Sequence, residues 1–137
     1  SENLPFEDNR FDVVLNVESS HCYGSIEKFI SEVERVLKKG GVFLWCDFRT
    51  ENSMKDLFNL FLSSGFVIEK EKDITKNIMS ALELLTPSRK KQINEHVPKI
   101  IKRVFESYAG ITGGEVNNAF VSGNLIYKSA ALKIAKH

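Results

Sequence analysis

Polar residues follow two apolar segments of the sequence, at the points where two strands are expected to end. His21 comes shortly after the apolar run Phe11–Val17, and Asp47 and Arg49 lie at the end of the run Val42–Phe48. Ligands of open parallel sheets bind beyond the carboxyl ends of the strands. If the two strands are neighbours, about 4.8 Å apart, His21 and Asp47 can meet in one crevice. A histidine held by a carboxylate is the usual construction of a general base that works near neutral pH.

The residues between these two runs are expected to form the helix of a β-α-β unit. The run Phe11–Val17 is almost continuously apolar, which is typical of a parallel strand buried on both faces. A helix is predicted to begin near Ser25, because apolar residues then recur with the period of a helix. These residues are Ile26, Phe29, Ile30, Val33, Val36 and Leu37. Gly40 and Gly41 are expected to end this helix, since glycine tolerates the left-handed cap, and the strand Val42–Phe48 then returns parallel to the first.

A second helix and an edge strand are predicted after Asp47. The helix follows Thr50–Ser53 and is closed by Gly65. Its apolar side consists of Met54, Leu57, Phe58, Phe61 and Leu62. The strand Phe66–Ile74 alternates apolar and charged residues in its second half, as a half-exposed edge strand does.

A long helical region is expected before the last strand. Thr75 can cap a first helix, and Thr86-Pro87 should start another, because proline suits the first helical turn. Pro98 is expected to break that helix, and an apolar stripe continues after it through Ile100, Ile101, Val104, Phe105 and Tyr108. The remaining predicted elements are the short helix Glu115–Phe120, the turn Ser122-Gly123-Asn124 and the strand Leu125–Ile134.

The composition favours one intracellular domain with a small partner. The 137 residues carry 19 Lys and Arg against 18 Asp and Glu, a formal charge of +1, so no global field marks a nucleic-acid binder. The two cysteines, Cys22 and Cys46, fit reduced thiols better than a disulfide framework, and they are too few for a metal site. No apolar run approaches the length of a membrane span. We therefore expect a cytoplasmic protein with no membrane span, no metal and a small-molecule partner.

Two segments of the sequence resemble the second half of class I S-adenosylmethionine-dependent methyltransferases. They are LPFEDNRFDVVLNVESSHCY and FISEVERVLKKGGVFLWCDF. The pattern LPF-x-D-x-x-FD before the family's fourth strand, and VLKKGG before its fifth, are hallmarks of that superfamily. More narrowly, NVESSHCY with a later DFR is similar to small-molecule O-methyltransferases that act on sugars, polyketides and phenolic or phthiocerol-type lipids.

The resemblance implies a partial Rossmann-like α/β sheet. Its strands would be the family's fourth to seventh, in the spatial order 4-5-7-6 with the last strand antiparallel. The helices between about residues 75 and 123 would be an insertion that caps the substrate site, and residues 1–137 would form the carboxyl-terminal part of a methyltransferase domain. The family's glycine-rich loop, G-x-G-x-G, has no counterpart among the eight glycines. The chain alone is therefore expected to lack a full cofactor site and to be inactive.

The resemblance also implies which residues contact the cofactor, S-adenosylmethionine, in a complete enzyme. The adenine would lie beside the segment that leads to Leu4, and the methionine end would lie near Asn16 and Val17. Glu18 could bind the cofactor or the substrate, but it could equally cap or solvate the loop.

The family's catalytic base and its partner match His21 and Asp47, so the resemblance assigns the catalytic role to these two residues. The alternatives are a solvated loop histidine and a helix-cap or turn carboxylate. Cys22 and Tyr23 could line the mouth of the substrate site, or they could pack against the crossover helix. Cys46 is expected to be a core thiol.

Two functions of different classes follow from this pattern. The first is transfer of a methyl group from S-adenosylmethionine to a hydroxyl of a small molecule, within a complete enzyme. The second is a non-catalytic, methyltransferase-like half-domain that acts through a partner chain. In both cases the first strand would lie at the edge of the sheet, and its apolar residues lack the lysines and prolines that protect an edge. These residues, Val13, Val14, Leu15 and Val17, predict self-association or pairing with a complementary chain.

Overall fold

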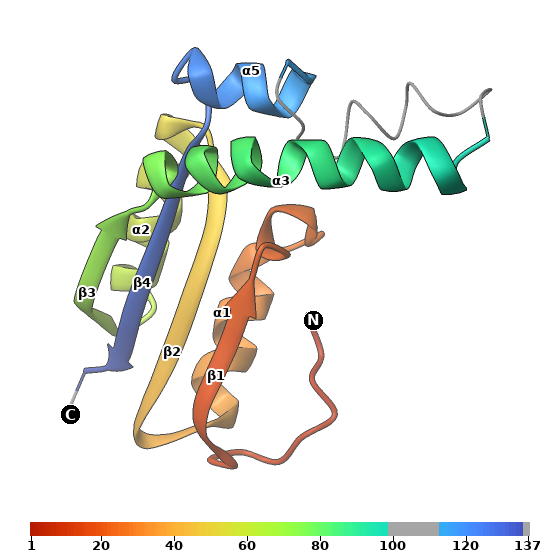
Figure 1. The fold of residues 1–137 in the computed structure, drawn as a ribbon. Helices are drawn as coiled ribbons and strands as arrows, with labels where there is room; N and C mark the ends of the chain where they lie inside the picture. The colour runs from red at the N-terminus through yellow and green to blue at the C-terminus, as the bar shows by residue number, and fades with distance from the viewer. Residues whose placement is uncertain (99–112, 136–137) are drawn as a thin grey trace. The chain divides into compact units, whose positions relative to one another are not determined.

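The computed structural model of the chain describes residues 1–98 and 113–135 (Figure 1). Contacts divide the chain into two compact units. The first unit comprises Ser1–Asp73 and Tyr127–His137, and it holds the sheet. The second unit is Ile74–Ile126, and its described residues are mostly helical. No helix within the described residues is long and apolar enough to cross a membrane.

The sheet has four strands in the order β1-β2-β4-β3 (Figure 1). They are β1 (Phe11–Val17), β2 (Leu37–Arg49), β3 (Phe66–Asp73) and β4 (Ile126–Ile134). Strands β1 and β2 pair in parallel, whereas β3 and β4 pair antiparallel. This order is the 4-5-7-6 arrangement that the sequence predicts, with the last strand antiparallel, so the predicted fold class is confirmed.

Two helices of the first unit pack on one face of the sheet. They are α1 (Ile26–Val36) and α2 (Glu51–Ser63), and each begins at a residue whose hydroxyl accepts a backbone N–H, Ser25 for α1 and Thr50 for α2. The buried Phe43 side chain of β2 lies between the helices, with its ring centroid 6.1 Å from that of Phe29 in α1 and 5.9 Å from that of Phe61 in α2. One strand residue thus contacts both helices, which confirms that they cover the same face, as right-handed connections require.

The opposite face of β1 and β2 exposes apolar side chains. Val13, Leu15 and Val17 are 51%, 66% and 52% exposed, and Leu44, which is the register partner of Leu15 in β2, is 38% exposed. Side chains alternate between the two faces of a strand, so all four lie opposite the helices. The sequence predicts burial of β1 on both faces, and in this chain the face opposite the helices is exposed.

The glycine pair after α1 has a different role from the predicted one. Helix α1 ends at Val36, because Leu37 is already extended (φ −73°, ψ 135°) and pairs with Phe11 as the first residue of β2. Gly40 has a φ of +81° within β2, and the register between the two strands shifts close to this point. The predicted cap at Gly40 and the predicted strand start at Val42 are therefore wrong, because the positive φ bends the strand instead of closing the helix.

The second helix and the edge strand follow the prediction closely. Four of the five apolar residues predicted for α2 are buried, but Leu62 is 54% exposed because it lies at the rim of the helix–sheet contact. Gly65 follows α2 with a φ of +82°, as a helix-closing glycine does. Strand β3 lies at the other edge of the sheet, as predicted for the strand Phe66–Ile74.

The second unit contains α3 (Thr75–His96) and α5 (Glu115–Val121). Helix α3 continues through Pro87, so the predicted new helix at Thr86-Pro87 is wrong; the Thr86 hydroxyl donates instead to the Leu82 carbonyl at 2.8 Å. Helix α3 does end before Pro98, since a residue that precedes proline disfavours the helical conformation. The apolar stripe predicted from Ile100 to Tyr108 lies outside the described residues.

Candidate active site

The backbone after β1 brings His21 over the end of β2. The Glu18 N–H donates to the Cys46 carbonyl at 2.9 Å, which extends the β1–β2 ladder by one residue. Glu18 then takes a φ of +48°, which is rare for a residue that is not glycine. The chain turns there into the short helix η1 (Ser20–Cys22), which lies against β2. The predicted meeting of His21 and Asp47 at the carboxyl ends of these strands is therefore confirmed.

The carboxylate of Asp47 is completely buried and accepts four hydrogen bonds. Its Oδ1 accepts from the His21 Nδ1–H at 2.7 Å and from the Phe48 backbone N–H at 2.9 Å. Its Oδ2 accepts from the Ser20 hydroxyl at 2.6 Å and from the His21 backbone N–H at 3.0 Å. A carboxylate has about four acceptor positions, so a protonated acid would lose one of these bonds.

This arrangement fixes which nitrogen of His21 can take a proton. Because the carboxylate of Asp47 only accepts, Nδ1 of His21 must carry the hydrogen of their shared bond, and Nε2 is left with the lone pair. The side chain of His21 is 28% exposed, and the ring of Phe48 packs against it at a centroid distance of 4.5 Å. The imidazole is thus held in one tautomer and one orientation, as a general base requires.

Ser20 links the carboxylate to two further side chains. Its hydroxyl donates to Asp47 and accepts from the Trp45 indole N–H at 3.0 Å and from the Arg49 guanidinium at 3.1 Å. Burial lowers the pKa of Arg49, while the charge of Asp47 opposes that change. The Ser20 hydroxyl has one hydrogen and two lone pairs, so all of its hydrogen-bonding capacity is used.

A cavity of about 400 Å³ lies beside β1 and is lined in part by Leu4, Asn16 and Tyr23. The amide nitrogen of Asn16 donates to the Ser19 hydroxyl at 3.0 Å and to the Tyr23 hydroxyl at 2.8 Å. Its Oδ1 is buried and has no hydrogen-bond partner among the described residues. A buried acceptor without a donor is unfavourable, so this oxygen marks a position where a ligand donor fits.

Leu4 is held at the cavity by a charged pair on α1. The Glu32 carboxylate accepts the Leu4 N–H at 2.7 Å, and Arg35 donates to the Leu4 and Phe6 carbonyls at 3.1 and 2.8 Å. Arg35 also donates to Glu32 itself at 2.8 Å. The hydrogen bonds from Arg35 and from the Leu4 N–H lower the pKa of Glu32 from 4.5 to about 2, and the bond from Arg35 has the larger effect. The backbone N–H and C=O of Leu4 are therefore already engaged.

We expect the hydrogen bond between the Glu32 carboxylate and the Leu4 N–H to break when Glu32 is protonated. The pKa of Glu32 is lowered in the folded chain. The stabilisation that its carboxylate contributes is therefore fully present above pH 4.5 and is lost as the pH falls toward about 2. The NMR amide signal of Leu4 should lose protection from exchange over this window, before the signals of the buried α1 residues change. In Glu32→Gln the Leu4 amide should be poorly protected already at neutral pH. Full protection of the Leu4 amide at neutral pH in that variant would show that Glu32 does not hold this N–H.

Comparisons with known proteins find similarity to methyltransferases. The family described as "Methyltransferase domain" matches residues 1–45. The probable phthiotriol/phenolphthiotriol dimycocerosates methyltransferase 2 of Mycobacterium ulcerans is 34% identical over 113 residues, which cover 82% of this chain and 44% of that protein. Both the matched family and this relative are methyltransferases. These matches support a class I S-adenosylmethionine-dependent methyltransferase.

Solved methyltransferases share the fold of the chain. A putative sarcosine dimethylglycine methyltransferase from Galdieria sulphuraria has a TM-score of 0.75 at 15% identity, over 98% of this chain and 57% of that one. The O-methyltransferase of a trans-AT PKS multienzyme of Brevibacillus brevis, solved in complex with S-adenosyl-L-homocysteine, has a TM-score of 0.71 at 19% identity, over 98% of this chain and 47% of that one. The chain spans about half the length of the curated relatives it matches.

Several residues of this methyltransferase chain fit the cofactor of its class, S-adenosylmethionine. The unpartnered Oδ1 of Asn16 needs a donor, and the amino-acid end of that cofactor carries an ammonium group. Leu4 and Asn16, which the sequence predicts as cofactor contacts, line one cavity with Tyr23, which it predicts as a substrate contact. The roles of these residues remain predictions.

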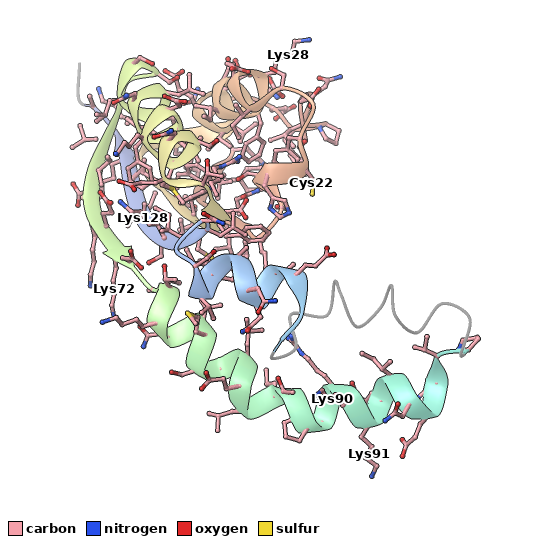
Figure 2. All side chains as sticks on the ribbon, turned by 90° about the horizontal axis from the view of Figure 1, so that it is seen from above. Cys22, Lys28, Lys72, Lys90, Lys91 and Lys128 are labelled. Atoms are coloured by element: carbon pink, nitrogen blue, oxygen red, sulfur yellow. The ribbon has the colours of Figure 1, made fainter. Side chains whose placement is uncertain are left out.

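The other predicted site residues lie outside that cavity. Val17 is on the exposed face of the sheet, and Glu18 is exposed at the turn after β1. The sulfur of Cys22 is exposed and points away from the sheet (Figure 2). Cys46 is partly buried, and burial raises the pKa of its thiol. Among the described residues, no group of three or more His, Cys, Asp or Glu could hold a metal ion.

Ser20, the Trp45 indole and the Glu32–Arg35 pair take part in the site without having been predicted. The spacing of Glu32 and Arg35 indicates a pair on the helix surface, but it does not predict their hydrogen bonds to the backbone around Leu4. Ser20 directly precedes His21, and that neighbourhood is the only signal in the sequence. The sequence places Arg49 among the polar residues at the strand ends but predicts no role for it.

Proposed function

We propose that this chain carries the base-bearing half of a methyltransferase that transfers a methyl group to a hydroxyl of a small molecule. The observation that supports it most is the His21–Asp47 pair, with Nδ1 of His21 bound at 2.7 Å and Nε2 left as the proton acceptor. A hydroxyl is a weak nucleophile until its proton is removed. A fixed neutral imidazole therefore supplies what transfer to an oxygen requires.

In this mechanism Nε2 of His21 takes the proton of the acceptor hydroxyl as the oxygen attacks. Asp47 stabilises the imidazolium that forms, because its carboxylate is already bound to Nδ1–H. Asn16 and Leu4 would hold the cofactor, and the unpartnered Oδ1 of Asn16 could accept a hydrogen bond from its ammonium group. S-adenosylmethionine supplies an electrophilic methyl group on a sulfonium, which must be approached in line.

The acceptor that we infer is a lipid-like alcohol. The Mycobacterium ulcerans protein and its relatives are phthiotriol/phenolphthiotriol dimycocerosates methyltransferases, and they reach 34% identity to this chain. The ring of Phe48 packs against His21, and an apolar neighbour of the base suits an apolar partner.

The test joins residues 1–137 to the amino-terminal half of the Mycobacterium ulcerans relative and supplies methyl-labelled S-adenosylmethionine with a long-chain secondary alcohol. Label should appear in the methyl ether of the alcohol, and no label should be transferred to the matching alkane. Calorimetry with S-adenosylhomocysteine controls for the cofactor site: the joined protein should bind, and the chain alone should bind weakly or not at all. Binding by the joined protein without transfer to any alcohol would contradict the proposal.

A second candidate function is association with another chain through β1, and one observation favours it. Strand β1 lies at the edge of the sheet, and Val13, Leu15 and Val17 each expose at least half of the side chain beside it. An unprotected apolar edge is a template for strand pairing. A non-catalytic half-domain would use this edge to complete its sheet with a partner.

The isolated chain is expected to self-associate as its concentration rises, which light scattering over a dilution series measures. Leu15→Lys should raise the dissociation constant of self-association by on the order of tenfold or more, because it places a charge on the exposed face beside the edge. Leu62→Lys is the matched control, since Leu62 is also more than half exposed but lies on α2. A wild-type chain that is monomeric at every concentration would exclude this association.

A further inference from the structure

Arg49 occupies an unusual position at the end of β2. Its guanidinium donates to the Ser20 hydroxyl at 3.1 Å, and Ser20 in turn donates to Asp47 at 2.6 Å. Its Nε is buried and has no hydrogen-bond partner among the described residues. A buried donor that makes no hydrogen bond is destabilising, so hydrogen bonding alone does not account for an arginine here.

The charge of Arg49 gives the better account. Asp47 is completely buried, and a buried carboxylate requires a compensating positive charge. When His21 is neutral, Arg49 is a cation that interacts with Asp47, both through space and through Ser20. The pair Asp47 and Arg49 is then electrically balanced without a proton on the imidazole.

The other ionisable groups at this end of the sheet leave that balance in place. On β2 and β4, burial raises the pKa of the Cys46 thiol and of the Tyr127 hydroxyl, so both remain uncharged near neutral pH. Glu18, at the turn after β1, is a carboxylate that acts on both of these groups, and it is exposed. Exposed charges are screened by solvent, so Glu18 offsets little of the Arg49 charge.

We propose that Arg49 is a positioning residue that, through Ser20, balances the charge of Asp47 and so keeps His21 in its neutral, proton-accepting form. Without this cation, Asp47 would draw a proton onto His21, and the imidazole would be charged before the acceptor arrives. Arg49 thus leaves the hydrogen bond between Asp47 and Nδ1 intact while it weakens the attraction of the site for a second proton. The inference rests on the proposed role of His21 as the base.

The test measures the protonation of His21 in the chain itself, by NMR of the imidazole nitrogens near pH 6.5, a pH close to the ordinary titration range of histidine. The signal is assigned by its loss in His21→Gln. Arg49→Met should raise the ratio of imidazolium to imidazole at His21 by roughly tenfold, as expected for removal of one charge a few ångströms away at the intermediate dielectric of a protein. Arg49→Lys should return the ratio to within about threefold of the wild-type value.

Two controls separate this role from a general effect of charge. Lys38→Met removes a cation from the opposite end of the same strand, where Lys38 pairs with Asp12 at 2.9 Å, and it should leave the ratio unchanged. His96 on α3 is exposed, and its imidazole NMR signal should be the same in every variant. An unchanged ratio at His21 in a folded Arg49→Met chain would overturn the proposal.

Arg49→Gln covers the case in which Arg49→Met does not fold, since a glutamine amide can still donate to Ser20 but carries no charge. A raised ratio in Arg49→Gln supports the proposal, and a wild-type ratio overturns it. If neither neutral variant folds while Arg49→Lys does, Arg49 is a structural countercharge and the proposal is again overturned. None of these readouts involves methyl transfer, so the proposed function can fail in its own assay without deciding this result.

Discussion

Replacing His21 by Ala in the complete methyltransferase is expected to lower turnover by about two to four orders of magnitude, the usual contribution of general base catalysis. The reason is that Nε2 of His21 is a proton acceptor that the site holds in a fixed tautomer, through the 2.7 Å bond between Nδ1 and Asp47. Affinity for S-adenosylmethionine should change little, because His21 does not line the cavity that contains Leu4 and Asn16. Steady-state kinetics of the joined protein with a lipid alcohol, together with calorimetry of cofactor binding, measure the two quantities.

Asp47→Asn extends the same experiment. The asparagine amide has two donors where the carboxylate has only acceptors, so one of the four donors around Asp47 must face another donor. Turnover should fall by roughly two to four orders of magnitude here as well, because the tautomer of His21 is no longer specified. Asp12→Asn is the matched control, since Asp12 is an exposed carboxylate at the other end of β1. Turnover at the wild-type rate in His21→Ala would remove His21 from the mechanism.

Phe43→Ala is expected to lower the free energy of unfolding by about 3–5 kcal/mol, the range observed for truncation of buried aromatic residues. Phe43 is 0% exposed, and its ring contacts those of Phe29, Phe61 and Phe66, so the cavity would open where both helices meet the sheet. Urea denaturation followed by circular dichroism measures the change. The loss should appear as a lower midpoint with a similar slope.

Leu44→Ala is the control for this experiment, because Leu44 is the next residue of β2 and points to the opposite, exposed face. It should cost about 1 kcal/mol or less, as truncation of a partly exposed side chain does. Equal losses in Phe43→Ala and Leu44→Ala would show that the core does not lie between the sheet and the helices.

Local patterns in the sequence predict the β-α-β unit well. The apolar run of β1 and the helical period of α1 depend on neighbouring residues, and both elements lie where those patterns put them. The errors occur where one residue type allows two backbone states. Gly40 can close a helix or bend a strand, and Pro87 can begin a helix or lie within one, and in each case the structure has the second.

Part of the candidate site could likewise be predicted from the sequence, and part could not. The rule that ligands bind at the carboxyl ends of parallel strands was enough to place His21 with Asp47. The role of Ser20 depends on the Glu18 turn, which aims the hydroxyl at Asp47, Trp45 and Arg49 on a strand more than twenty residues away. No spacing in the sequence encodes such a turn. The unpartnered Oδ1 of Asn16 likewise depends on where its own amide nitrogen binds.

The strand order also constrains how the chain is made. Strand β4 is the last strand of the chain, yet it lies between β2 and β3. A nascent chain leaves the ribosome from its amino terminus, so β1, α1 and β2 can assemble early, whereas β3 has no neighbour in the sheet until residues 126–134 have been synthesised. During that interval β2 presents an open edge, and its exposure to other nascent chains or to chaperones lasts for the whole time needed to translate the helical unit.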